Sequence, residues 1–207
     1  MSTDRKKAFT LIEVLVTLAI ILILAGALVT AGKYLRVRAE RQLTQSAIEV
    51  ISTALQQYYD QTGNFPPMIW TADELETALS AATVTVVSPG GTHPTSNTGR
   101  IWWASESLFY FLDRVPQSKA VLSGLSNRML SNKDETGVGL QVQISVGGTT
   151  TTYDWVRFVD AWGTTIDYRY NNTEYAISGY SFPLVRSAGP NKILSEPTVT
   201  GDDLRNQ

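Results

Sequence analysis

The chain of 207 residues carries 17 Lys and Arg, 19 Asp and Glu, and a single His, for a formal net charge of -2. This length allows one membrane anchor and one globular domain, with little room for two large domains. Because the chain has no cysteine, disulfides, a thiolate nucleophile and a cysteine-based zinc site are excluded. The near-neutral charge, without a long basic run, argues against a nucleic-acid partner.

An apolar run extends from Phe9 to Gly32, and Glu13 is its only ionisable residue. At a helical rise of about 1.5 Å per residue, the run spans roughly 36 Å, enough to cross a hydrocarbon core of about 30 Å. We therefore predict a transmembrane helix. The basic cluster Arg5-Lys6-Lys7 should remain in the cytoplasm, which places the residues after Lys33 on the far side of the membrane.

A removable secretory signal peptide is one alternative for this run. Such a peptide also has basic residues before an apolar stretch, and Ala25-Gly26-Ala27 is similar to its cleavage site. However, the apolar run is longer than the roughly 7 to 15 residues of a signal peptide, and Glu13 places a carboxylate inside it. A plain signal anchor, which only tethers the chain, is a second alternative, but it gives no reason for Glu13.

Glu13 is the most informative residue of the apolar run. A carboxylate inside a bilayer costs on the order of 2.5 to 3.5 kcal/mol on insertion scales, so we expect it to be paired or to serve a function. A cut between Ala8 and Phe9 would place the new α-amino group four residues away, about one helical turn. Neighbouring subunits would offer the same positive charge, and such a pair would set the register between helices.

The run Lys6-Lys7-Ala8-Phe9-Thr10-Leu11-Ile12-Glu13-Val14 resembles the class III signal of type IV pilins and of the pseudopilins of type II secretion. The resemblance implies that a prepilin peptidase cleaves after Ala8 and that Phe9 becomes the N-methylated first residue. It also implies that Glu13 neutralises a neighbour's N-terminus during assembly. The family usually has glycine where this chain has Ala8; alanine is small enough to be accepted, with slower processing as an open alternative.

After Gly32 the sequence becomes amphipathic. Apolar positions recur at intervals of three and four residues, at Leu43 or Thr44, Ala47 or Ile48, Ile51, Leu55 and Tyr58. Because Gly63 and Pro66-Pro67 stop the pattern, we predict one continuous helix that ends between Thr62 and Asn64. The segment from Tyr58 to Pro66 is also similar to the helix end of pilins, where an aromatic residue, a Thr-Gly pair and a proline recur.

The residues after this helix predict a body with short helices and an antiparallel sheet. Helical composition marks 73–82 and the aromatic stretch from Trp102 to Leu112, and the run from Val87 to Gly99 reads as a loop. Leu140, Val142, Ile144 and Val146 alternate with polar residues before Gly147-Gly148, which predicts a strand and a hairpin turn. The remaining strands are expected at 152–159, 165–170 and 173–180, the last two flanking Asn171-Asn172.

The predicted fold is therefore α+β and pilin-like, with a long N-terminal α-helix packed on an antiparallel sheet of about four strands. The helix has a transmembrane half and an amphipathic half. The predicted parts are a leader peptide at 1–8, a transmembrane and assembly helix at 9–32, an amphipathic helix at 33–64, and a periplasmic globular domain with a C-terminal loop at 65–207.

The turn Asp160-Ala161-Trp162-Gly163, followed by a Tyr-rich strand, resembles a turn of the major pseudopilins. We predict a structural role for this turn. Asp160 can bond the backbone of its own turn, Gly163 supplies a permissive φ, and Trp162 is expected to fill the core.

The stretch from Ser187 to Asn191, with Gly201-Asp202-Asp203-Leu204, resembles the loop that binds calcium in many major pseudopilins. The resemblance implies that Asn191, Asp202 and Asp203 contribute calcium ligands, and hard oxygen donors suit this ion. Asn191 stands where the family often has an acidic residue. A polar C-terminal tail without metal is the alternative.

We find no catalytic constellation and predict no enzyme. His93 is the only histidine and lies in a Pro-, Thr- and Gly-rich loop, where a solvated side chain is expected. A glycosidase-type carboxylate pair would need a particular separation among the candidate acids, Glu74, Glu106, Asp113 and Asp134. Trp102-Trp103 are expected in the core, with an aromatic sugar-binding surface as the alternative.

These observations predict a pseudopilin-like structural subunit of the inner membrane, with a cytoplasmic N-terminus and a periplasmic domain, which self-associates into a filament for type II protein secretion. Its expected partners are other pseudopilins, inner-membrane components of the secretion system and the prepilin peptidase. One alternative is a type IV pilus subunit for adhesion, motility or DNA uptake. Another is a membrane-tethered module that binds carbohydrate or protein.

Overall fold

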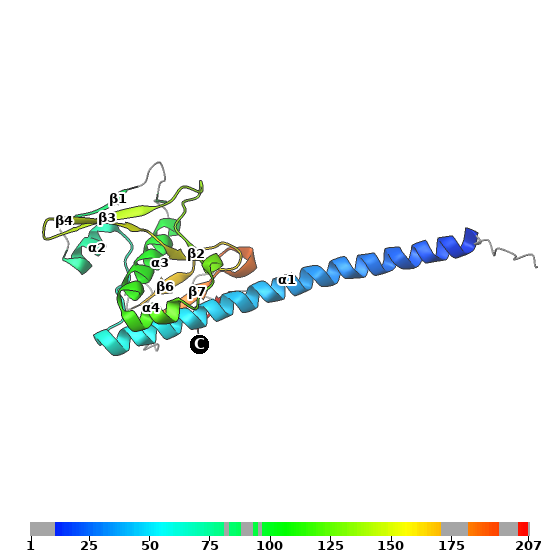
Figure 1. Ribbon diagram of the computed structural model, residues 1–207, viewed down its shortest axis with the longest axis horizontal. Helices are drawn as coiled ribbons and strands as arrows, with labels where there is room; N and C mark the ends of the chain where they lie inside the picture. The colour runs from blue at the N-terminus through cyan, green and yellow to red at the C-terminus, as the bar shows by residue number, and fades with distance from the viewer. Residues whose placement is uncertain are drawn as a thin grey trace, which may run out of the picture. The chain divides into compact units, whose positions relative to one another are not determined.

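The computed structural model describes residues 11–80, 83–87, 93–94, 97–170, 182–194 and 203–206 (Figure 1). The chain divides into two compact units, Met1–Ala39 and Glu40–Gln207. The first unit contains the N-terminal part of helix α1, and the second contains the rest of α1 and every other described element.

Helix α1 extends without interruption over Leu11–Thr62. Its sequence has no proline, and Leu, Ile and Ala predominate before Gly32, which favours a continuous helix. An 18-residue window has a mean hydropathy of 2.8, and none of that window is buried within the chain. Among the described residues, α1 is the helix that is long and apolar enough to cross a membrane.

The C-terminal end of α1 confirms the predicted boundary. The last helical residue is Thr62, and the Gly63 amide donates a hydrogen bond to the carbonyl of Tyr59 at 2.8 Å. Gly63 has a φ of 76°, a left-handed conformation that glycine adopts without steric cost. Pro66 and Pro67 then prevent further helix.

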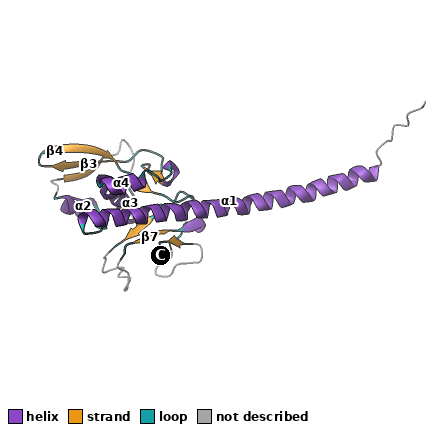
Figure 2. Ribbon diagram, turned by 60° about the horizontal axis from the view of Figure 1, so that its bottom comes forward, coloured by secondary structure: helices purple, strands orange, loops and turns teal. Residues whose placement is uncertain are grey.

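The C-terminal half of α1 packs into a first hydrophobic core. This core contains side chains of α3 (Asn97–Arg114) and α4 (Pro116–Leu122). The Ser118 hydroxyl donates to the Ala54 carbonyl at 2.9 Å, and Figures 1 and 2 both place α4 beside this half of α1. The buried members are Ala47, Ile48, Ile51, Ala54, Leu55, Phe65, Leu108, Leu112, Leu122, Leu125, Met129, Phe158, Ile166, Tyr168 and Val185.

Two small antiparallel sheets complete the first core. The short 3₁₀ helix η1 (Asn127–Met129) leads into β2 (Leu130–Ser131), which pairs with β5 (Arg157–Phe158). The other sheet has the order β6-β7-β8, from β6 (Asp167–Arg169), β7 (Leu184–Ser187) and β8 (Leu204–Arg205). Phe158 of β5, Tyr168 of β6 and Val185 of β7 all have no measurable exposure.

A second hydrophobic core lies on the other side of α3. It is closed by α2 (Ala72–Leu79) and by the sheet β1-β3-β4, from β1 (Thr83–Val87), β3 (Gln141–Val146) and β4 (Thr149–Asp154). Figures 1 and 2 show β3 and β4 separated from α1 by α3. The buried members are Ile69, Leu75, Val84, Trp102, Trp103, Tyr110, Phe111, Leu140, Val142, Ile144 and Trp155.

The structure confirms the α+β class, the antiparallel pairing, the helices near 73–82 and 102–112, and the hairpin at Gly147-Gly148. Both turn glycines have positive φ, 58° and 82°, as a type I′ turn requires. The prediction of one sheet of about four strands is wrong, since the described strands form three separate sheets. Helix α3 buries apolar side chains in both cores, so it separates strands that were expected to share one sheet. The strand expected at 173–180 lies outside the described residues.

Candidate functional site

The predicted assembly site lies at the start of α1. Glu13 is in the first turn of the helix, and its side chain is exposed between the exposed neighbours Ile12 and Val14. A carboxylate near a helix N-terminus is favoured by the helix dipole, and an added positive charge there would pair with it. The predicted cleavage residues, Ala8 and Phe9, lie outside the described residues.

The surface of α1 around and beyond Glu13 is largely apolar. These large side chains are exposed in the described part of the structure, so they require lipid or other apolar helices around them. The exposed members are Leu11, Ile12, Val14, Leu15, Val16, Leu18, Ile20, Ile21, Leu22, Ile23, Leu24, Leu28 and Val29. This segment can therefore exchange a bilayer for a bundle of identical helices without exposing apolar surface to water.

The predicted calcium residues are brought together only in part. Asn191 ends the short 3₁₀ helix η3 (Gly189–Asn191), is exposed, and accepts a hydrogen bond from the Ile193 amide through Oδ1 at 2.8 Å. The pairing of Ser187 with Leu204 places the buried Asp203 next to the start of this turn. Asp202 lies outside the described residues. Within the described ranges, no group of three or more His, Asp and Glu side chains is arranged to hold a metal.

The Asp160 turn has the predicted structural role. Oδ1 of Asp160 accepts hydrogen bonds from the amides of Trp162 and Thr164 at 3.0 and 2.8 Å. Oδ2 accepts from the Ser187 hydroxyl at 2.6 Å, which ties the turn to β7. Burial raises the pKa of Asp160, although these hydrogen bonds oppose the rise. Gly163 has a φ of 81°, as expected of the glycine in this turn.

The core role predicted for Trp162 is wrong, because its side chain is only half-buried. Tyr168 is the residue that fills the core here, and its hydroxyl donates a hydrogen bond to the Pro66 carbonyl at 2.7 Å. Trp102 and Trp103 are buried in the second core, which confirms their predicted role and leaves no exposed tryptophan surface for a sugar at that place.

A buried polar cluster in the second core was not predicted. Nε2 of His93 lies 2.8 Å from Oε2 of Glu106, and Nη1 of Arg157 lies 3.6 Å from Oε1 of the same carboxylate. The guanidinium of Arg157 stacks on the Trp102 ring, 3.5 Å from its centroid. The expectation that His93 is solvated is therefore wrong. Its side chain is almost fully buried and has an aromatic neighbour in Trp103, at 4.8 Å between ring centroids.

Keeping the Glu106 carboxylate charged costs free energy because the side chain is buried. Burial raises the pKa of Glu106, and the nearby His93 and Arg157 oppose the rise. A signal for this cluster was present in the sequence, because Glu106 lies four residues after Trp102 and four before Tyr110. That spacing puts the carboxylate on an aromatic face of a helix, where a buried partner is required.

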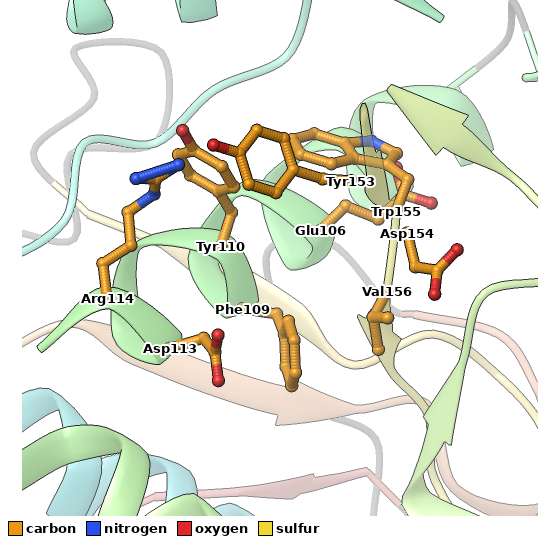
Figure 3. Close-up of a pocket in the computed structure, with 9 residues that line it drawn as sticks. All are labelled: Glu106, Phe109, Tyr110, Asp113, Arg114, Tyr153, Asp154, Trp155 and Val156. Carbon is orange, nitrogen blue, oxygen red and sulfur yellow. The ribbon is translucent and has the colours of Figure 1, made fainter. Parts of the chain in front are cut away.

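A cleft of about 430 Å³ separates α3 from the segment that joins β4 to β5. Figure 3 shows the side chains that line it: Glu106, Phe109, Tyr110, Asp113, Arg114, Tyr153, Asp154, Trp155 and Val156. Two of its charged side chains are engaged within the chain, since Lys119 binds Asp113 at 2.9 Å and Arg114 stacks on Tyr110 at 4.0 Å.

The candidate glycosidase acids do not converge on one site. Glu106 and Asp113 line the same cleft, but each is engaged by a cation. Glu74 accepts a hydrogen bond from the Trp70 amide, and Asp134 accepts from the amides of Thr136 and Val138. These bonds give the last two acids structural roles, in a helix start and in a turn.

The comparisons with known proteins agree with the N-terminal motif. A family model, described as the prokaryotic N-terminal methylation motif, matches residues 3–29. Comparison with curated proteins and with solved structures gave no significant match. The matched residues include Glu13 and most of the exposed apolar run, which fit a membrane-anchored protein that a prepilin peptidase processes. The chain therefore carries the N-terminal signature of type IV pilin-like proteins.

Proposed function

We propose that this chain is a structural subunit of a pseudopilus-type filament that serves type II protein secretion. The observation that carries the proposal is the methylation motif, matched at residues 3–29, together with the exposed large apolar side chains of α1 from Leu11 to Val29. A prepilin peptidase cleaves after Ala8, and Phe9 becomes the methylated N-terminus. The mature subunit then waits in the inner membrane with its globular unit on the periplasmic side.

Assembly exchanges one apolar environment for another. Full burial of a Leu, Ile or Val side chain contributes on the order of 1.5 to 3 kcal/mol relative to exposure to water. The exposed apolar residues of α1 gain this burial in lipid and retain it when helices of neighbouring subunits surround them. Transfer of the helix from membrane to filament therefore needs little net free energy. Other proteins of the system supply this free energy through cytoplasmic ATPase activity.

Glu13 gives the assembly its register. In the filament its carboxylate pairs with the α-amino group of a neighbouring Phe9, so that no charge stays unpaired among apolar side chains. A helix that docks one turn out of place would leave both charges unpaired, at a cost of several kcal/mol. This pairing selects one axial position among many that apolar packing alone would accept.

The C-terminal loop is proposed to bind calcium through Asn191, Asp202 and Asp203. Asn191 keeps a lone pair on Oδ1 beyond the one used by the Ile193 amide. Asp203 directly precedes β8, whose Leu204 pairs with Ser187 just before the turn that contains Asn191. Carboxylate, amide and backbone oxygens are the ligands that calcium prefers, and the bound ion would fasten the tail to β7.

A type IV pilus subunit is the second candidate, since the N-terminal motif serves both systems. Two observations favour secretion. The turn Asp160-Ala161-Trp162-Gly163, followed by a Tyr-rich strand, resembles a turn of the major pseudopilins, and the chain lacks the cysteines that close the C-terminal loop of many pilins. Deletion of the gene separates the two: we expect loss of secreted proteins from the medium with surface pili unchanged, and the reverse result would favour the pilus.

The processing step is tested by the intact mass of the protein extracted from its native membrane. The expected mass begins at a methylated Phe9. A mass that begins at Met1, or after a cut near Ala27, would contradict filament assembly and leave a tethered or secreted domain. An Ala8→Gly variant is a matched control, because it restores the residue usual in the family and should be cut at least as fast.

A further inference from the structure

The sheet β1-β3-β4 has an open edge at β4. This strand pairs with β3 on one side and, among the described strands, with none on the other. The Trp155 amide, directly after β4, donates to the Leu140 carbonyl at 2.9 Å, so the backbone of Trp155 faces β3. Because this direction alternates along an antiparallel strand, the backbone groups of Thr150, Thr152 and Asp154 face away from β3. Within the described ranges, no other group of the chain bonds to them.

The opposite edge of the sheet is closed. Val84 of β1 pairs with Ile144, and by the same alternation its amide faces away from β3. That amide donates to Oε1 of Glu76, in α2, at 2.6 Å, so a charged side chain covers the edge. Strand β4 has no such protection, because residues 149–153 contain no charge and no proline and pair with β3 without a bulge. Its four threonines, Thr149 to Thr152, are exposed.

The cleft of about 430 Å³ lies beside this open edge. Residues 153–156 form one part of its lining, and α3 forms the other. The ring centroids of Tyr153 and Trp155 lie 5.5 and 5.9 Å from that of Tyr110 (Figure 3). Five of the nine lining residues are aromatic or aliphatic, and the volume falls in the range of about 300 to 1,000 Å³ typical of ligand sites. The cleft therefore suits a large apolar side chain.

A strand added to β4 would bring side chains to the cleft. In an antiparallel pair, directly opposite residues have their side chains on the same face. Tyr153 packs against the second core, so side chains opposite Thr151 and Tyr153 would lie on the face of the sheet that carries the cleft. Residues opposite Thr150 and Thr152 would exchange the backbone hydrogen bonds. Such bonds give affinity, and a pocket for alternate side chains gives specificity.

A second copy of the chain does not supply this occupant. The cleft-facing residues of its β4 would be the small Thr149 and Thr151, and Tyr153 is already packed on its own Tyr110. Its β1 edge is closed by Glu76, and the described strands of the other two sheets have four residues or fewer. An extended segment of another protein, with large apolar side chains at alternate positions, fits both the edge and the cleft.

We propose that β4 binds such a segment of another protein as an added antiparallel strand, with a large apolar side chain of that segment in the cleft. The backbone groups of Thr150, Thr152 and Asp154 form the hydrogen bonds, and the aromatic lining selects the side chain. This binding requires neither the membrane nor the filament, so it goes beyond the proposed function.

The test measures the binding of a fluorescein-labelled peptide to the full chain in detergent, by fluorescence anisotropy. The peptide has the length of β4, six residues, in which threonine alternates with phenylalanine, and a lysine is added at each end for solubility. We expect saturable binding. Replacement of every phenylalanine by alanine should weaken it at least tenfold, because the cleft then loses its apolar occupant.

Two N-methylated peptides separate strand addition from contact through side chains alone. In the antiparallel arrangement, methyl groups on the threonine amides face β4 and remove hydrogen bonds, so binding should weaken at least tenfold. Methyl groups on the phenylalanine amides face solvent and should change binding by less than about twofold. The two peptides are matched in composition and in the number of methyl groups.

Thr152→Pro is the corresponding change in the protein. Proline removes the outward amide and is tolerated at a strand edge, so the fold should persist while binding weakens at least tenfold. Thr152→Val keeps the amide and should keep the binding; it also controls for peptide that enters detergent. Thermal unfolding checks that both variants are folded, and the methylated peptides decide the question if the proline variant is not.

Several results would overturn the proposal. No saturable binding, equal binding of the two methylated peptides, or binding that survives Thr152→Pro would exclude strand addition. The reverse preference between the methylated peptides would exclude the antiparallel arrangement. A full chain that dimerises, with the dimer lost in Thr152→Pro, would make a second copy the occupant in place of another protein.

Discussion

The Asp160 turn offers the sharpest test of the fold, because one side chain accepts three hydrogen bonds. Asp160→Ala removes the acceptor for the amides of Trp162 and Thr164 and for the Ser187 hydroxyl. An unsatisfied buried donor costs about 1 to 3 kcal/mol. The expected loss of stability is smaller than the sum of three such costs. Burial of the Asp160 carboxylate is itself unfavourable, as its raised pKa indicates, and the variant no longer buries it.

We therefore expect Asp160→Ala to lower the free energy of unfolding by about 2 to 4 kcal/mol. In a domain of this size, that lowers the melting temperature by roughly 4 to 16 °C. Asp160→Asn is the matched control. The Asn Oδ1 still accepts hydrogen bonds from both amides, and the Asn side-chain amide can donate to the Ser187 hydroxyl oxygen. The free energy of unfolding should therefore fall by only about 1 kcal/mol.

The assay is thermal unfolding of the full chain in detergent, followed by tryptophan fluorescence. All five tryptophans lie after residue 64, so the signal reports the globular unit and not the apolar helix. A change below about 0.5 kcal/mol for Asp160→Ala, typical of a surface site, would refute the structural role of the turn. An Asn variant as unstable as the Ala variant would show that the charge, and not the hydrogen bonds, is what matters.

Three further predictions concern assembly, calcium and pH. Glu13→Val should leave membrane insertion intact but reduce filaments at least tenfold in electron micrographs; normal filaments would reject the charge pair. Chelation of calcium should lower the melting temperature of the wild type by several degrees, and Asp202→Ala with Asp203→Ala should abolish that response. An equal response in both proteins would reject the metal. Because burial raises the pKa of Glu106, its protonated form stabilises the fold below the ordinary value of 4.5, and this stability is lost as pH rises towards the folded-state pKa. Glu106→Gln should flatten the pH dependence of the free energy of unfolding above pH 4.5, and an unchanged curve would contradict the assignment.

The features predicted well are those with a local physical cause. The end of α1 follows from Gly63 and the two prolines, and the hairpin follows from alternating apolar residues before Gly147-Gly148. The N-terminal motif, which a family model matches at residues 3–29, is marked by the unusual cost of a carboxylate at Glu13. In each case, a few neighbouring residues decide the outcome, so no long-range contact has to be known.

The features missed depend on distant partners. β1 is a short strand whose pairing partner, β3, lies more than fifty residues later in the chain, so its own residues do not predict a strand there. His93 is buried because Glu106 and two tryptophans lie around it, and nothing in its own loop predicts that. The division into three sheets follows from packing on both sides of α3, which depends on the tertiary arrangement.

The position of α3 between the two cores has a mechanical consequence. In the proposed extraction from the membrane, force applied along α1 would reach the first core directly, because Ile48, Ile51 and Leu55 belong to it. The second core takes from α1 only a peripheral contact with Tyr58 among the described residues, so the pull reaches it through α3. The sheet β1-β3-β4 is thus shielded from the load. A subunit pulled by its helix can deform near α1 while its outer layer keeps its shape.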